Sequence, residues 1–245
     1  MIILLIKLLA AHLIGDFILQ SDKLCNKRYH EKLSKRISAN CIHSLIQASL
    51  SYCFIGLWNL WWIPFTIFIS HFIIDFIKTQ YGKKDLPYFI GDQIAHYCVI
   101  VLIWYYLQSN LSEIQSISKI SLTGWIIFTS FLAILKPSSI LIKLFMEYHA
   151  WVPNIPTLQG LPNAGKWIGY LERVLILIFI FTHNIEGIGF LLAAKSIFRF
   201  GELNQSKDIK VTEYVLIGTF LSFTIAIMTG YIAEWGMSLE KEILI

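Results

Sequence analysis

The sequence opens with MIILLIKLLAAHLIGDFILQ (residues 1–20), and this stretch decides the fold class. Residues 2–20 are almost entirely apolar, and one helix crosses the hydrocarbon core of a bilayer with about 20 such residues. His12 and Asp16 interrupt the apolar run, and no small-residue cleavage site follows it. We therefore expect a retained first membrane span rather than a signal peptide.

The composition of the whole chain agrees with a membrane protein. Of its 245 residues, 56% are hydrophobic and 15% are charged, whereas about a quarter of the residues in a soluble domain are charged. The apolar runs show no alternation with polar residues, which favours spanning helices over barrel strands. The fold class is therefore predicted to be all-α, a polytopic transmembrane helical bundle with about seven to eight membrane segments. The net charge of +4 is typical of membrane orientation, so we expect no nucleic-acid partner.

Eight apolar segments have spanning or near-spanning length. They divide into a four-helix membrane half at 1–108, an extracytoplasmic loop at 109–121 and a second membrane half at 122–245. Segment 185–200 is short and charged, so it is either a full span or a half-span of the membrane. The predicted segments are 2–20, 39–60, 61–80, 88–108, 122–147, 166–183, 185–200 and 212–235.

The loop charges predict the orientation of these segments. The stretch 22–38 carries six Lys or Arg residues among scattered apolar ones, which predicts a basic helix lying at the interface on anionic lipid. By parity it falls on the same side as the lysines near 78–84 and the basic group near 195–210. The positive-inside rule makes that side cytoplasmic and places the N-terminus outside. The Pro- and Gly-rich stretch 152–165 is expected to be a surface loop.

Seven His and Asp residues, which we call the His/Asp cluster, are predicted to share one depth near the cytoplasmic ends of the first four segments. Three pairs have a spacing of four residues, which places both side chains on one helix face about 5–6 Å apart. An ionisable group at membrane depth costs a few kcal/mol unless it is paired or hydrated, so the pairs should converge inside the bundle. The cluster comprises His12, Asp16, His43, His71, Asp75, Asp92 and His96.

Imidazoles and carboxylates that converge from several helices are typical of metal coordination. The mixed N and O ligands suit Zn, Mn or Fe, and their number allows one or two divalent ions. With no thiolate in the layer, an open reactive site is expected, in which Asp16, Asp75 or Asp92 acts as a catalytic base. Gln20 and Gln93 lie beside the layer and are expected to orient the ligands. A proton or ion pathway and an inert hydrogen-bond network remain alternatives.

The same residues carry a resemblance to a known family. The run His12-Leu-Ile-Gly-Asp16-Phe-Ile-Leu-Gln20, then His43, His71-Phe-Ile-Ile-Asp75 with Lys78, and Asp92-Gln93-Ile-Ala-His96 resembles a bacterial membrane family catalogued as domain of unknown function 3307. The resemblance covers residues 10–100, and 165–173 and 194–200 are similar to its longer members. It implies the bacterial cytoplasmic (inner) membrane but supplies no activity. The pattern is also loosely similar to membrane-bound metal-dependent hydrolases, an analogy only.

A second polar set lies in the second half of the chain, at Lys166, Arg173, Lys195 and Arg199. One interpretation is cationic anchoring at the interface, with nearby glutamates as partners. The other is a clamp that binds the anionic head group of a substrate or lipid. The Lys136–Pro137 pair in the fifth segment predicts a kink or a re-entrant break.

Three classes of function remain open. The one that we expect is a membrane-embedded metal-dependent hydrolase that acts near the cytoplasmic leaflet on a phosphorylated or lipid-linked substrate. A transporter coupled to protons or a divalent ion is the first alternative. A non-enzymatic scaffold or regulatory protein is the second, with a cytosolic protein or a second copy of the chain as its partner. In each case membrane lipids surround the chain.

Overall fold

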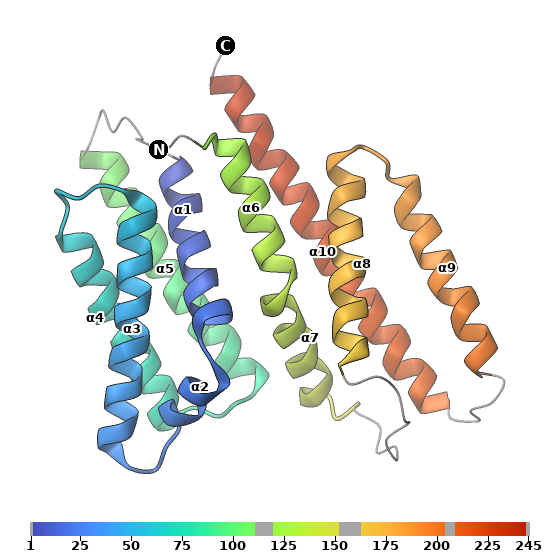
Figure 1. Cartoon of the computed structure of the whole chain (residues 1–245), viewed down its shortest axis with the longest axis horizontal. Helices are drawn as coiled ribbons and strands as arrows, with labels where there is room; N and C mark the ends of the chain where they lie inside the picture. The colour runs from blue at the N-terminus through green and yellow to red at the C-terminus, as the bar shows by residue number, and fades with distance from the viewer. Residues whose placement is uncertain (1, 111–119, 152–162, 204–208, 244–245) are drawn as a thin grey trace. The chain divides into compact units, whose positions relative to one another are not determined.

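The computed structural model describes residues 2–110, 120–151, 163–203 and 209–243, and within these ranges the side chains of 198–211 and 240–243 are not described (Figure 1). Every regular element within the described ranges is helical, which confirms the all-α class. The chain divides into two compact units, unit 1 at Met1–Thr129 and unit 2 at Ser130–Ile245.

Unit 1 is a bundle of four long helical rods with a short helix at one end (Figure 1). Helix α3 packs against α1 and α4, and α5 packs against α1 and α4. Consecutive rods run in opposite directions, so the end of α1, the start of α3, the end of α4 and the start of α5 meet at one end of the bundle. The elements are α1 (Ile2–Leu13), η1 (Ile14–Leu19), α2 (Asp22–Arg28), α3 (Leu33–Ile55), α4 (Trp62–Tyr81) and α5 (Leu86–Asn110).

The two ends of this bundle differ in chemistry. The end that holds the N-terminus of α1 is filled by a core of apolar side chains, while the opposite end contains the His/Asp cluster. At the apolar end, small and branched side chains let the rods pack closely. In a lipid environment such van der Waals packing has to hold helices together, because lipid supplies no hydrophobic driving force between them. The buried members of this apolar core are Leu4, Leu8, Ala48, Ile55, Ile63, Ile67, Ile100, Ile103 and Leu107.

The first rod changes its winding in the middle. Helix α1 continues without a gap into η1, a six-residue π-helix. π-helical turns are rare, and they occur most often at functional sites. Gly15 lies in this turn, and a Cβ atom at its position would overlap the side-chain amide of Gln47 on α3. Glycine is therefore the residue that lets η1 approach α3 closely.

Each of the eight predicted segments is helical, with 122–147 divided between α6 and α7. Five helical stretches among the described residues are long and apolar enough to cross a membrane. The predicted count of seven to eight spans is not confirmed, because α3, α8 (Ala164–Phe181) and α9 (Glu186–Leu203) are not among these five. The five candidate spans among the described residues are Ile2–Leu19, Trp62–Tyr81, Leu86–Asn110, Leu122–Tyr148 and Thr212–Leu239.

The structure corrects two predicted segments. The basic stretch 22–38 is not one helix, because α2 ends at Arg28 and α3 begins at Leu33. Of the predicted loop 152–165, residues 152–162 lie outside the described residues. Helix α8 already begins at Ala164, so Gly165 is helical and not part of a loop. Most of the predicted polar loop, residues 111–119, also lies outside the described residues.

Unit 2 contains the end of α6 (Leu122–Ile134), α7 (Lys136–Tyr148), α8, α9 and α10 (Ile209–Ile243). The predicted kink lies between α6 and α7, where Leu135 leaves helical geometry immediately before Lys136 and Pro137. Helices α8 and α10 make the most extensive packing in this unit. At Gly230 of α10, an added Cβ atom would overlap Ile180 of α8, so glycine permits that approach.

Candidate functional site

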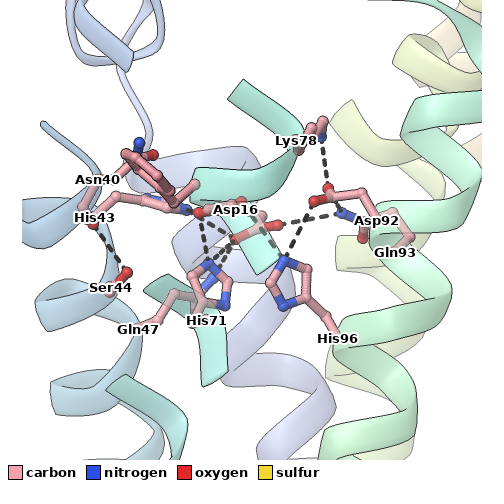
Figure 2. Close-up of polar contacts among 12 residues, drawn as sticks. Asp16, Asn40, His43, Ser44, Gln47, His71, Lys78, Asp92, Gln93 and His96 are labelled. Carbon is pink, nitrogen blue, oxygen red and sulfur yellow. Dashed lines mark hydrogen bonds and ion pairs between the residues drawn. The ribbon is translucent and has the colours of Figure 1, made fainter. Parts of the chain in front are cut away.

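The structure brings all seven members of the His/Asp cluster together at one end of unit 1, and Figure 2 shows Asp16, His43, His71, Asp92 and His96. They come from α1 and η1, α3, α4 and α5, and all are buried except Asp16, which is half-buried. Three overlapping groups each have ligand atoms that lie within 4.8 Å of one another. These groups are His12, Asp16 and His71; His43, His71 and Asp75; and Asp16, Asp92 and His96.

Asp16 faces three histidines from three different rods. Its Oδ1 atom lies 3.2 Å from His43 Nε2 and 3.4 Å from His71 Nε2. Its Oδ2 atom lies 3.6 Å from His12 Nε2. The carboxylate therefore lies among the rings of α1, α3 and α4.

Asp75 and Asp92 each face a cation with one oxygen and at least one histidine with the other. The Oδ2 atom of Asp75 lies 3.3 Å from His71 Nε2 and 3.5 Å from His43 Nε2, and its Oδ1 atom lies 2.5 Å from Arg28. In Asp92, Oδ1 lies 3.5 Å from His96 Nε2, while Lys78 donates to Oδ2 at 2.6 Å.

Several atoms of the cluster are buried without a hydrogen-bond partner. They are the Nε2 atoms of His71 and His96, the Nδ1 atom of His43, Oδ2 of Asp75 and Oδ1 of Asp92. A buried polar atom without a partner costs free energy, so each needs an explanation.

The spacing of these atoms explains why they are buried together without partners. Ligand atoms that lie about 2.0–2.1 Å from one ion are themselves separated by about 3.0–3.4 Å. The closest His–Asp contacts of the cluster span 3.2 to 3.6 Å, and the His71 and His96 rings stack with centroids 4.0 Å apart. The imidazole nitrogens and carboxylate oxygens are therefore spaced like the ligand atoms around one ion.

A small cavity adjoins the three rings of His12, His71 and His96. Its volume is about 20 Å³, and Ser51 and Ser70 also line it. A polar cavity of this size holds about one water molecule. The histidines thus border a space that water can occupy.

Arg28 belongs to the site although the sequence placed it only in a basic surface stretch. Its guanidinium is buried, pairs with Asp75, and donates from Nε to Asn40 Oδ1 at 2.8 Å. Burial alone lowers the pKa of Arg28, but the carboxylates of Asp75 and Asp16 outweigh burial and raise it. Arg28 is therefore a permanent cation at the edge of the cluster.

Amide side chains hold the carboxylates and rings in place. Gln47 donates both to Asp16 Oδ1 and to the His12 carbonyl oxygen. Gln93 donates to Asp16 Oδ2 at 3.2 Å, and its Oε1 atom lies 3.2 Å from His12 Nε2. Gln20 lies between Arg28 and the Asp16 carbonyl oxygen, where its amide accepts from the first and donates to the second. Gln20 and Gln93 thus lie where the sequence placed them, and Gln47 is an addition.

The cationic residues predicted in the second half lie in unit 2, and the structure describes the side-chain contacts of three of them. Arg173 is buried and donates to the Ile134 and Leu135 carbonyl oxygens at the break between α6 and α7, and to Ser139 and Ser222. Lys195 donates to Glu172 at 2.7 Å. Lys166 is exposed beside the Tyr170 ring, and the Arg199 side chain lies outside the described residues.

Residues 4–123 match the sequence profile of a family described as "Protein of unknown function (DUF3307)". This part of the chain therefore belongs to that family, which confirms the resemblance read from the His and Asp motifs. No match to a curated protein or to a solved structure is found for the chain. Its activity must consequently be argued from the site itself.

Proposed function

We propose that this DUF3307 protein is a membrane-embedded metal-dependent hydrolase that holds one or two divalent ions, Zn, Mn or Fe, in its His/Asp cluster. It would lie in the bacterial inner membrane with its N-terminus outside, so that the cluster faces the cytoplasmic leaflet. A phosphorylated or lipid-linked molecule of that leaflet would be its substrate.

The observation that supports this proposal is the set of buried ring nitrogens and carboxylate oxygens without hydrogen-bond partners. Apart from His43 Nδ1, they come from α4 and α5 and lie close together around one centre, where Figure 2 shows His71, Asp92 and His96. A cation at that centre would satisfy these atoms together, since mixed imidazole and carboxylate ligands suit a first-row divalent ion.

The charges of the site also favour a cation. The cluster contains three carboxylates, and Arg28 and Lys78 balance two of them. With neutral histidines, the buried site retains one negative charge, which is costly in a medium of low dielectric constant. A divalent ion reverses that charge and makes the site attractive to an anionic substrate.

The carboxylates differ in the roles that they suit. Asp75 and Asp92 each give one oxygen to a cation and turn the other toward histidines, an arrangement that orients a metal ligand. Among the described residues, Asp16 has only histidines as ionisable partners within salt-bridge distance. Asp16 is therefore the best candidate for the general base, while the ion polarises the substrate.

A hydrogen-bond lock without metal is the second candidate, and the Arg28–Asp75 and Lys78–Asp92 pairs favour it because they hold the helices together unaided. A transporter has less support, since the apolar core fills the opposite end of the bundle. A transported ion needs polar groups along its whole path.

Elemental analysis of the detergent-purified protein separates these candidates. We expect one or two equivalents of a divalent metal in the wild type, and a strong reduction in His71→Ala, which removes a ring shared by two of the ligand groups. His149→Ala is the matched control, because His149 is exposed and lies in unit 2. A wild type without bound metal would support the lock and reject the hydrolase.

The same preparations test turnover on phosphorylated lipids presented in mixed micelles. Asp16→Asn should retain metal through its remaining oxygen and lose roughly 100-fold or more of the rate, since it cannot act as a base. Metal binding with no turnover in the wild type on any lipid phosphate would separate the metal site from this substrate class.

A further inference from the structure

A groove lies between α4 and α5 at the end of unit 1 that contains the cluster. It has a volume of about 300 Å³, and its walls are largely apolar, formed by Ile74, Ile77, Pro87 and Ala95. Gly91 leaves one wall open, since a Cβ atom added there meets nothing within 4 Å. The apolar lining suits an apolar chain.

Two charged residues of the site also line this groove. Lys78 and Asp92 contribute to its wall and form their 2.6 Å ion pair there. The Lys78 side chain is 18% exposed, and an ammonium group has three donors. Within the described part of the chain, Asp92 is the one acceptor that the structure gives it. Lys78 can therefore bind a further anion from the groove.

The loop at this end of the groove adds positive charge. Residues 82–85 connect α4 to α5 and carry Lys83 and Lys84, both exposed. Lys84 lies 4.5 Å from the Tyr29 ring centroid, on the chain segment that follows α2. An apolar groove with ammonium groups at one end matches a molecule with an anionic head and an apolar chain.

We infer that this groove binds an anionic phospholipid of the surrounding leaflet, with its phosphate on Lys78 and its acyl chain along α4 and α5. A volume of about 300 Å³ is at the lower limit of ligand pockets and accommodates a head group with the first part of a chain. The rest of the chain remains in the bilayer.

This location places the head group beside Asp92 and so beside the cluster. A phosphate on Lys78 shares the ammonium group with the Asp92 carboxylate, because Lys78 has donors to spare. The bound lipid is the substrate only under the proposed function. The binding itself depends on the groove and on Lys78.

Photo-crosslinking of the full chain in phosphatidylcholine vesicles tests the inference. The probes are phosphatidylglycerol and phosphatidylcholine, each with a diazirine in the acyl chain, and labelled peptides are located by mass spectrometry. We expect phosphatidylglycerol to label α4 and α5 around the groove, and to do so about fivefold more than phosphatidylcholine, which corresponds to one lysine contact at a membrane surface. Unlabelled phosphatidylglycerol should compete. Equal labelling by both probes would overturn the inference.

Two variants locate the site. Gly91→Leu fills the groove and should abolish this labelling, while Gly218→Leu is the matched control, since a Cβ atom at Gly218 of α10 also meets open space. Lys78→Gln should remove the preference for phosphatidylglycerol. Unchanged labelling in Gly91→Leu would reject the groove.

Metal content measured on the same samples separates the two proposals. Selective labelling of a protein without bound metal would support the lipid site and reject the hydrolase. Bound metal without selective labelling would reject the lipid site and leave the hydrolase supported.

Discussion

At the scale of single residues, the site depends on how each carboxylate divides its two oxygens. Asp75 gives one oxygen to Arg28 and the other to histidines, and Asp92 does the same with Lys78. A carboxylate fixed on one side by a cation cannot rotate away from the other side. The histidines therefore face oxygens that the protein holds in a defined orientation.

Arg28→Gln tests this arrangement. Removing one partner of a buried ion pair leaves an uncompensated charge, so we expect the free energy of unfolding in detergent to fall by about 3 kcal/mol. The control is Lys143→Gln, whose pair with Glu147 is exposed and should contribute less than about 0.5 kcal/mol. Adding Asp75→Asn to Arg28→Gln should restore part of the loss. If the two substitutions act additively, the pair is not coupled.

The sequence predicted the seven cluster residues because their chemistry is rare in apolar helices and their four-residue spacing is regular. Gln47 follows His43 by four residues, so the same rule could have found it. Arg28 could not have been found in this way. It reaches Asp75 from a seven-residue helix after a π-turn, and no periodic pattern encodes that path.

At the scale of elements, the π-turn η1 sets the position of Asp16 relative to α3. Gly15→Ala places a methyl group where the Gln47 amide lies. Since alanine is otherwise the better helix former by about 1 kcal/mol, a loss of stability can arise only from this overlap. We expect thermal unfolding in detergent to show a loss of about 1–3 kcal/mol.

Gly91→Ala provides the comparison for Gly15→Ala, because its methyl group meets open space on α5. It should leave stability unchanged or raise it slightly. Combining Gly15→Ala with Gln47→Ala relieves the overlap, so the double variant should lose less than the sum of the two single losses. Equal behaviour of the two glycines would show that η1 and α3 are not in close contact.

Helix boundaries were predictable only where the chain carries a local signal. Pro137 predicted the break between α6 and α7. The role of Arg173 at that break was not predictable, because its acceptors lie on other helices of unit 2. Nor was the separation of α2 from α3, since the basic residues continue through both. Tertiary contacts decide these features, and a single sequence does not display them.

At the scale of the whole molecule, unit 1 combines an apolar core at one end with a polar cluster at the other. At the apolar end, van der Waals packing of the core side chains holds the rods together. At the polar end, three acidic and four imidazole side chains need partners, and four rods supply them. A bound ion would connect all four rods at one point, so metal binding should stabilise the folded state of the whole unit.

Removal of metal from the intact protein tests this coupling. An ion held well above its dissociation constant stabilises the folded state by a few kcal/mol, so a chelator should lower Tm by about 5–10 °C in a chain of this size. Adding the ion back should restore Tm in the wild type, and His149→Ala should behave in the same way. In His71→Ala, chelator and ion should change Tm much less than in the wild type, because two of the three ligand groups lose this ring. A wild type whose Tm does not respond to the chelator would mean that ion pairs and hydrogen bonds alone join the four rods.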